Sequence, residues 1–559
     1  MAQIDAIGRT PVVIVGAGPI GLSLAGDLGW RGIPCVLIER SDGTVFQPKM
    51  DMVGIRTMEF CRRWGIVDDV ENAGYNRDYP QDYAWVSQLA GGYEFGREPF
   101  PSVRDEARPE QSPQKRERCP QNFFDPVLTR FARKTGNVQV RYCTEYVSHE
   151  ERDDGVTVTV RDLASGAEET IECQYVVGCD GGASRVKENL GIRMTGTPAL
   201  TYTTNAIIEC KGLEALHDKK PGYRYIFIGP EGTWSTVVAI NGCDWWRFSI
   251  VGDGTMRTLS EDDVAAAFRR AVGRDDFEFR IISVMPWIRR QLVADNYGTA
   301  RVKIAGDAAH ITSPTGGFGM NMGIQDAVDL GWKLQAMVQG WGGEHLLDTY
   351  ELERRPVAIR NVNEATSNLK LMLTPRENLS AAVFEPGEAG DEARRIFGDA
   401  YTKMMKREWY TIGIHLGFRY EGSSIVLPDG TPEPEDTVST YVQTSRPGHR
   451  APHVWLEPGR STLDLFGQAF VLLRFDRSLT VDLLRDAADQ AGVPFNVVDI
   501  DNEPARAAYE RALVLVRPDG HVAWRADTAP EDPQALIDVI RGMYPVRPEM
   551  VVSEEVATR

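Results

Sequence analysis

Cysteine is scarce in this chain, and its distribution excludes two classes of site. There are eight cysteines among 559 residues, no two of them are spaced as C-x-x-C, and none follows Cys243. Isolated cysteines of this kind are typical of buried free thiols in a reducing compartment. We therefore expect neither a cysteine-ligated metal nor a dithiol redox centre, and we expect no metal site.

Long apolar runs and an excess of positive charge are missing as well. No run reaches the roughly eighteen apolar residues of a membrane-spanning helix. Residues 1–9 lack a basic-then-apolar signal pattern, so we expect a cytoplasmic protein. The net charge of −18 argues against nucleic acid or an anionic membrane as a partner. The length allows about three to four domains of ordinary globular composition.

Three glycine-rich turns are the informative feature of what is present. The first follows the apolar run at 12–15 and contains Gly16, Gly18 and Gly21. Gly16 permits a tight turn, Gly18 lets the backbone approach a pyrophosphate, and Gly21 lets helix and strand pack closely. This spacing predicts a dinucleotide-binding βαβ unit, and a glycine turn in a nucleotide-free α/β domain is the alternative.

An acidic residue completes this first unit. Glu39 ends the second predicted strand, 18 residues after Gly21, where a carboxylate accepts both hydroxyls of a ribose. We include the motif neighbours Pro19 and Arg40 among the expected cofactor contacts.

The second and third turns extend the same site. The second spans 179–185 and contains Asp180, and the third spans 305–321. Glycines in the third turn leave room for a flat ring system, and the helix predicted over 321–339 favours negative charge at its start. A flexible loop at 315–319 is the alternative. The contacts expected from the third turn are Gly306, Asp307, Pro314, Gly317, Gly319, Met320 and Asn321.

These turns resemble the paired signatures of the FAD-dependent class A aromatic hydroxylases. The resemblance covers about residues 10–375 and implies FAD as cofactor, with Asp180 and Asp307 at the matching positions. Gln121 resembles the family's FAD-contacting glutamine, and Arg56 resembles its arginine near the pyrophosphate. Lys187 stands where the family usually has arginine, which preserves the charge.

The C-terminal part narrows the resemblance. Its strand and helix order over 451–549 is similar to the thioredoxin-like tail of the phenol hydroxylase and 2,4-dichlorophenol hydroxylase branch. Without C-x-x-C it is expected to be redox-silent and to serve packing or homo-oligomerisation. The resemblance implies a Rossmann-like FAD domain (α/β) with an inserted antiparallel-sheet substrate domain (α+β). The expected boundaries are 1–75, 115–195 and 285–375 for FAD, 76–114 and 196–284 for substrate, and 376–450 for a helical or linker region.

The implied reaction suggests one catalytic residue. Members of the family use NAD(P)H and O2, and we expect hydroxylation of a phenol ortho to its hydroxyl. Attack on the ring is electrophilic, so a base that removes the phenol proton helps. Asp51 matches the aspartate beside the substrate hydroxyl in phenol hydroxylase, and the alternative is a loop aspartate that caps the helix near Ile55.

Aromatic residues of the predicted sheet are candidates for a substrate pocket, although aromatic residues in strands usually form core. His310 is expected to be structural rather than a base. Arg247 and Arg289 are candidates to pair with an anion or to stack on the flavin. The pocket candidates are Tyr223, Tyr225, Trp234, Trp246, Arg289 and Pro314.

Three other functions compete with this one. The first is a tailoring hydroxylase of a larger polyketide or alkaloid aromatic, which a larger pocket would favour. The second is a flavin halogenase, but Trp245-Trp246-Arg-Phe does not match the W-x-W-x-I-P segment of those enzymes. The third is a catalytically silent flavin-binding scaffold.

Overall fold

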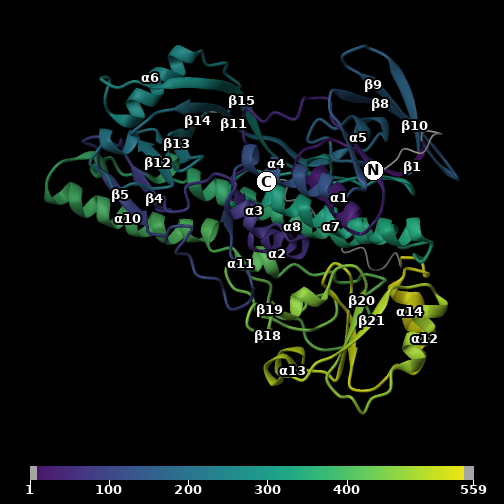
Figure 1. Cartoon of the computed structure of the whole chain (residues 1–559). Coiled ribbons are helices and arrows are strands. Elements are labelled where there is room, and N and C mark those ends of the chain that lie inside the picture. Colours follow the sequence, from purple (N-terminus) through teal and green to yellow (C-terminus); the bar gives the residue numbers. More distant parts are fainter. Residues whose placement is uncertain (1–8, 253, 547–559) are drawn as a thin grey trace.

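The computed structural model describes residues 9–252 and 254–546. The stretch 1–8, most of the segment inspected for a signal sequence, and residues 547–549 of the expected C-terminal domain lie outside this range. Within the described part, none of the helices combines the length and apolar character that a bilayer crossing requires. Two large sheets lie above the long helices α7 (Phe318–Gln339) and α8 (Asp348–Leu373), and a smaller C-terminal domain lies below them (Figure 1).

The first sheet has seven strands in the order β7-β2-β1-β10-β9-β8, with β16 beside β10. Strands β7, β2, β1, β10 and β16 run parallel, and β9 and β8 form an antiparallel extension. Their bounds are β1 (Arg9–Val15), β2 (Cys35–Ile38), β7 (Val138–Arg141), β8 (Thr144–Arg152), β9 (Gly155–Asp162), β10 (Glu168–Gly178) and β16 (Val302–Ile304).

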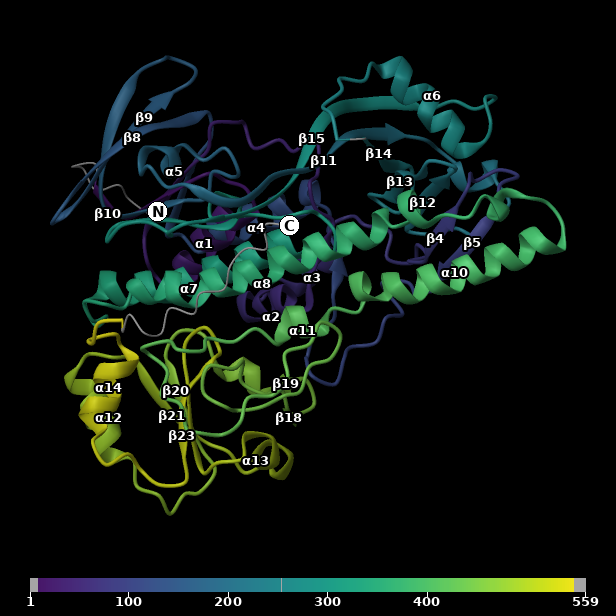
Figure 2. The ribbon, with the colours of Figure 1, turned by 180° about the vertical axis from the view of Figure 1, so that it is seen from behind.

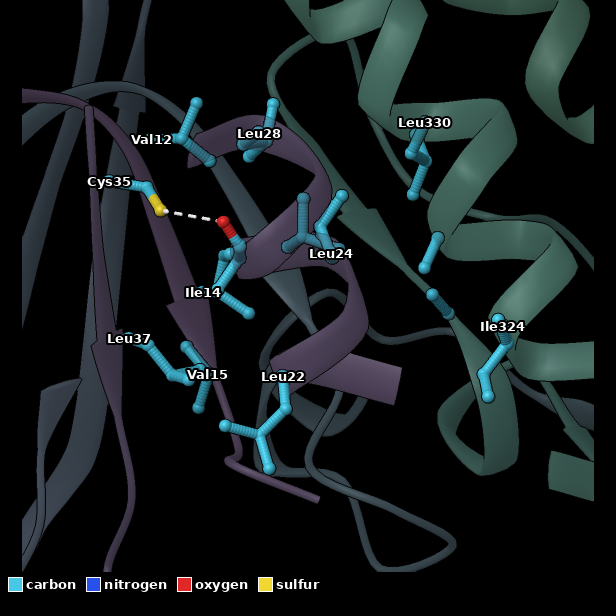
Figure 3. Packing of buried hydrophobic residues seen from close by; sticks show 14 of the residues in the cluster. Val12, Ile14, Val15, Leu22, Leu24, Leu28, Cys35, Leu37, Ile324 and Leu330 are labelled. Carbon is cyan, nitrogen blue, oxygen red and sulfur yellow. Dashed lines mark hydrogen bonds between the residues drawn. The ribbon is translucent and has the colours of Figure 1, made fainter. Parts of the chain in front are cut away.

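Helices cover the parallel part of this sheet, which explains its unbroken apolar strands. Figure 3 shows Val12 and Ile14 of β1 facing Leu24 and Leu28 of α1 (Pro19–Trp30), with Leu330 of α7 beyond. The helix α4 (Gln121–Lys134) packs on α1, and two short helices adjoin it: α2 (Ile55–Trp64) and α3 (Val67–Glu71). The helix α5 (Arg185–Asn189) follows the second glycine turn.

The second sheet has eight strands in the order β17-β15-β11-β14-β13-β12-β4-β5. Its neighbours are antiparallel except for the parallel pair β12 and β4. Strands β11 and β15 are 16 and 15 residues long, and they pair with each other along nearly their whole length. The bounds are β4 (Tyr83–Val86), β5 (Glu94–Glu98), β11 (Met194–Glu209), β12 (Arg224–Gly229), β13 (Gly232–Ala239), β14 (Trp245–Val251), β15 (Arg280–Ala294) and β17 (His310–Ile311).

Helices flank this second sheet too. The helix α6 (Glu261–Val272) lies at its top, and α10 (Glu388–Trp409) runs beside α8 and packs against β5 (Figure 2). Part of 376–450 is therefore a long helix, joined to α8 through α9 (Pro375–Asn378) and followed by α11 (Ile412–Leu416). A short antiparallel pair is formed by β3 (Met52–Val53) and β6 (Glu117–Arg118). In sequence, these two strands flank β4 and β5 of the second sheet.

The C-terminal domain contains a four-stranded sheet in the order β21-β20-β22-β23, in which only β20 and β21 are parallel. The expected mixed fold class is confirmed, and the domain boundaries stay predictions. The bounds are β18 (Trp455–Glu457), β19 (Arg460–Ser461), β20 (Phe470–Arg474), α12 (Asp482–Gln490), β21 (Phe495–Asp499), α13 (Glu503–Tyr509), β22 (Leu513–Val516), β23 (Val522–Ala526) and α14 (Pro533–Ile540).

Buried ion pairs attach the C-terminal domain to the long helices. The guanidinium of Arg517 donates to both carboxylate oxygens of Glu353 on α8, at 2.6 and 2.9 Å. Lys333 on α7 contacts Glu353 and Asp329, each at 2.7 Å. All four side chains are at most 1% exposed.

Candidate functional site

The three glycine turns meet at one edge of the parallel sheet. The strands that precede them, β1, β10 and β16, are adjacent: Val15 pairs with Gly178, and Gly178 pairs with Ile304. Parallel strands place their carboxyl ends at one edge, which is where ligands bind in open α/β sheets. A cavity of about 490 Å³ opens there. Of the expected cofactor contacts, those that line it are Gly16, Gly18, Pro19, Glu39, Arg40, Gln121, Asp180, Asp307, Pro314, Gly317, Gly319 and Met320.

Glycine is required at two of these positions. Gly16 has φ +102°, and a Cβ atom there would lie 2.6 Å from the carbonyl oxygen of Cys179. Gly317 has φ +69° and ends the turn ahead of α7, which begins at Phe318 rather than at the expected Asn321. Both backbone conformations are costly for residues that carry a side chain. By contrast, a Cβ on Gly18 would meet no atom within 4 Å, so its backbone is open to the cavity.

The carboxylate of Glu39 is fixed at the end of β2. Its Oε2 accepts a hydrogen bond from the N–H of Ala17 at 2.9 Å, and its Oε1 accepts one from the N–H of Ser41 at 2.8 Å. Each oxygen has a remaining lone pair, so the carboxylate can still accept from two hydroxyls.

Two other carboxyl groups at the cavity have unused acceptors. The Oδ1 atoms of Asp180 and Asp125 are buried and have no hydrogen-bond partner among the described residues. Burial raises the pKa of Asp180 and raises that of Asp125 to about 7. Buried polar atoms are normally paired, so these oxygens fit a ligand that supplies hydroxyl donors.

Arg56 lies away from the cavity that the other expected cofactor contacts line. Its guanidinium donates to Glu59 at 2.7 Å and to the carbonyl oxygen of Asp519 in the C-terminal domain at 2.9 Å. It is 2% exposed and absent from the cavity wall. Arg56 therefore joins two domains.

Three further expected contacts support the cavity without lining it. A Cβ on Gly21 would lie 1.9 Å from the carbonyl oxygen of Gly16, so Gly21 serves close packing. Gly306 packs on Ile20 in the same way. Asn321 accepts from the N–H of Gly54 at 2.7 Å and donates to the carbonyl oxygen of Gly317 at 2.8 Å. It holds the loop before α2 against the third turn.

A second cavity of about 140 Å³ adjoins the first beneath the antiparallel sheet. Of the expected pocket residues, Tyr223, Arg289 and Pro314 line it. The residues shared by both cavity walls are Lys49, Asp51, Met52, Arg247, Trp287, Pro314 and Gly317.

The other expected pocket residues point away, because successive side chains of a strand face opposite sides. Arg224 and Arg247 line the cavity, so their neighbours Tyr225 and Trp246 pack into the core on the far side. Trp234 also lies in that core, with Arg270 4.0 Å above its ring. Tyr225, Trp234 and Trp246 are therefore absent from the wall of the second cavity.

Asp51 lies where the two cavities meet, and three side chains hold it. Its Oδ1 accepts from Arg118 at 3.2 Å, and its Oδ2 accepts from Arg247 at 3.0 Å and from the hydroxyl of Tyr223 at 2.6 Å. The pairing of β3 with β6 brings Asp51 and Arg118 together, since the N–H of Cys119 donates to the Asp51 carbonyl. The alternative role as a helix cap is not seen, because Gly54 caps α2 without a side-chain hydrogen bond.

Comparisons with known proteins identify the family. Residues 9–365 match the model of an FAD binding domain, and residues 444–544 match the model of the C-terminal region of aromatic-ring hydroxylases. The 4-methyl-5-nitrocatechol 5-monooxygenase of a Burkholderia species is 31% identical, over 96% of this chain and 97% of that protein. The phenol 2-monooxygenase of a Pseudomonas species is 30% identical, over 96% and 93%.

This chain belongs to the FAD-dependent aromatic-ring hydroxylases. A solved structure agrees: chromopyrrolic acid-soaked RebC with bound 7-carboxy-K252c has a TM-score of 0.89 at 37% identity, covering 96% of this chain and 99% of that one. The hydroxylase is therefore an oxidoreductase that uses FAD. The open backbone at Gly18 and the unpaired oxygens of Asp180 and Asp125 fit that cofactor.

The side chain of His310 in the hydroxylase is buried behind the third turn. Its Nε2 lies 2.6 Å from Asp326, the side chain is fully buried, and it lines neither cavity. Asp326 also accepts from Arg354 at 2.8 Å, so the histidine belongs to a buried polar cluster behind the third turn.

Several pocket residues of the hydroxylase were not found from sequence. Arg118 and Tyr83 lie in short strands that carry no motif, and nothing local marks them. Glu408 and Trp409 come from the end of α10, inside the segment expected to be helical or linker. The helical period of 388–409 is the signal that would have suggested that element.

Proposed function

We propose that this hydroxylase inserts oxygen into a phenolic ring ortho to a hydroxyl group, using NAD(P)H and O2, with Asp51 as the group that accepts the phenol proton. The position of Asp51 at the junction of the two cavities is the observation that carries this proposal. A ring in the smaller cavity would have its hydroxyl at Asp51 and its neighbouring carbon toward the larger cavity.

The hydrogen bonds of Asp51 leave room for one more donor. A carboxylate accepts about four hydrogen bonds. Oδ2 already accepts two, from Tyr223 and Arg247, whereas Oδ1 accepts one from Arg118. The free position on Oδ1 suits a phenol hydroxyl.

The charges around Asp51 keep it ionised. Burial alone would raise its pKa, but the guanidinium groups of Arg247 and Arg118 and the Tyr223 hydroxyl outweigh burial and lower it. Asp51 is therefore a carboxylate at neutral pH. A base of low pKa removes little of the proton in the ground state. The phenol becomes more acidic as its ring loses electron density to the incoming oxygen, so transfer of the proton to Asp51 becomes favourable during the reaction.

The cofactor and the protein have separate roles in the proposed reaction. Reduced FAD, held by the three glycine turns, would supply the activation of O2 for transfer to the ring. The chain orients the ring and excludes water, with Tyr83, Trp287 and Trp409 in the cavity wall. Held orientation supplies much of the rate in such reactions.

The size of the second cavity favours a single ring over a polycyclic substrate. A cavity of roughly 150 Å³ is known to hold benzene, and this one measures about 140 Å³. Hydroxylation of a larger polyketide or alkaloid aromatic is the second candidate function, because relatives are named putative polyketide hydroxylases and RebC binds 7-carboxy-K252c. It requires the larger cavity to hold part of the substrate.

A panel of phenols tests the proposal. The purified yellow protein is incubated with NADH or NADPH and each phenol, oxidation of the nucleotide is followed, and products are identified. We expect stimulated oxidation and a catechol from at least one monocyclic phenol. Oxidation stimulated only by polycyclic aromatics would favour the tailoring role, and none with either class would favour a silent flavin scaffold.

Location and assembly complete the proposal. We expect a cytoplasmic homo-oligomer, from the free cysteines and from the packing or association role expected of the C-terminal domain. Light scattering of the full chain measures the oligomeric state.

A further inference from the structure

Arg289 is a buried cation in the wall of the second cavity. It lies on β15, paired with Thr201 of β11 next to an irregularity in the strand register. The residue is 5% exposed, and it lines the smaller cavity together with Arg224 and Arg247.

Among the described residues, no carboxylate forms an ion pair with the guanidinium of Arg289. Its Nε and Nη1 atoms are buried and find no hydrogen-bond partner among the described residues. The neighbouring arginines differ, since Arg224 donates to Glu408 at 2.8 Å and Arg247 donates to Asp51 at 3.0 Å. Glu408 is the acid whose charge acts on Arg289. Its Oε1 accepts from Arg224 and from the N–H of Gly316, whereas its Oε2 is buried without a hydrogen-bond partner among the described residues.

Such a group is costly in a folded protein unless a ligand pairs with it. A buried charge without a partner loses its hydration and gains nothing in return. Burial, with repulsion from Arg224 and Arg247, lowers the pKa of Arg289 to about 10, so it still carries its charge at neutral pH. The site is therefore prepared for an anion that enters with the substrate.

We propose that Arg289 binds a carboxylate carried by the aromatic substrate, in addition to the phenol hydroxyl that Asp51 binds. A guanidinium presents parallel N–H donors that match a carboxylate in two hydrogen bonds. This inference rests on the proposed function, because it assumes that the second cavity holds the substrate. Asp51 and Arg289 would then recognise two substituents of one ring.

Matched pairs of small ligands test it. Benzoate is compared with benzamide, and 4-hydroxybenzoate with 4-hydroxybenzamide, by the absorbance change of FAD in the holoenzyme. We expect each carboxylate to bind about 10- to 100-fold more tightly than its amide, the range for a charged hydrogen-bonded contact. R289M should lose that preference. R290Q, at the next position of the strand and absent from both cavity walls, should keep it.

Thermal melting supplies a second readout. R289M should melt at a higher temperature than the parent without ligand, because an unpaired buried charge has been removed. Benzoate should raise the melting temperature of the parent and leave that of R289M unchanged. If R289M does not fold, R289Q takes its place in both measurements.

Defined outcomes would overturn the inference. They are equal affinity for acid and amide in the parent, binding of neither, a preference that survives in R289M, or loss of FAD from that variant, which would assign Arg289 to the cofactor. Turnover of neutral phenols without a carboxylate preference would leave the proposed function standing. A carboxylate preference without turnover of any probe would reject the proposed function alone.

Discussion

The hydroxyl of Tyr223 donates to Oδ2 of Asp51 at 2.6 Å, although the two residues lie 172 positions apart in sequence. Asp51 lies in the loop before β3, and Tyr223 directly precedes β12 of the antiparallel sheet. Arg118 stacks 3.6 Å from the Tyr223 ring and contacts the same carboxylate. The charge state of Asp51 therefore depends on how the antiparallel sheet packs against the loop before β3.

Replacing Tyr223 by phenylalanine should shift the pH dependence of turnover. The hydroxyl lowers the pKa of Asp51, so its removal raises that pKa. Because Asp51 acts as a carboxylate, the acid limb of the pH–rate profile should move to higher pH. Y225F is the control, since its hydroxyl donates to the Lys220 carbonyl on the far side of the sheet. Superimposable profiles for Y223F and the parent would contradict the assignment.

Asp51→Asn should separate cofactor binding from chemistry. We expect normal FAD content, because Asp51 contacts protein side chains through both oxygens. Turnover should fall by about 10²- to 10⁴-fold, the usual contribution of a positioned acid or base. The measurement is single-turnover product formation beside the FAD absorbance spectrum. A parent-like rate and pH profile would exclude Asp51 as the proton acceptor.

Gly16→Ala should abolish FAD binding. The new methyl group would lie 2.6 Å from the Cys179 carbonyl, at a backbone angle that disfavours a side chain. Gly166→Ala is the control, because Gly166 has a similar positive φ of +74° in a turn where nothing lies within 4 Å of the new atom. Both variants carry a backbone strain of about 1 kcal/mol, but only G16A should lose bound flavin. Equal FAD content in the two would contradict the role of the first turn.

Arg517→Met should weaken the attachment of the C-terminal domain. Without Arg517, Lys333 is the one cation of this cluster that pairs with the two buried carboxylates of Glu353 and Asp329. Breaking a buried ion pair costs about 3–5 kcal/mol of stability. Arg511→Met is the control, since its pair with Asp527 is largely exposed and such pairs contribute about 0–1 kcal/mol. Urea unfolding of both variants measures the difference. Equal losses would show that the ion cluster adds nothing to docking.

The cofactor site was predictable because its determinants are local. The strand before Gly16, the glycine spacing and Glu39 each lie within one βαβ unit, and adjacency of β1, β10 and β16 then brings the turns together. The position of Arg56 was not predictable, because its local motif does not determine which way the side chain points. Its partner Asp519 lies more than four hundred residues away in sequence.

The substrate side was predictable only in part, because a strand sequence does not say which face is buried against which neighbour. A shift of one residue along β12 determines whether Tyr225 or Arg224 faces the cavity, and both faces of this sheet are covered. The second cavity also depends on Trp409, from an element that joins the sheet only through tertiary packing. Asp51 was found by resemblance, whereas its partner Arg118 required the pairing of β3 with β6.

Buried histidines of the C-terminal domain should make it sensitive to acid. Burial lowers the pKa of His449 to about 3 and those of His453 and His521 to about 4. Each is neutral in the fold, so its contribution is complete above the unfolded pKa of about 6.5 and is lost as pH falls toward the folded value. Glu117 and Asp125, whose pKa values burial raises to about 7, act in the opposite direction.

A comparison of variants isolates the histidine effect from those acids. H449Q keeps a neutral side chain within reach of Glu433, which the imidazole contacts at 3.3 Å. Between pH 6.5 and 4, this variant should lose about 1.4 kcal/mol less stability per pH unit than the parent. Urea unfolding at pH 6.5, 5.5 and 4.5 gives the slopes, and parallel slopes for H449Q and the parent would show that His449 does not titrate with unfolding.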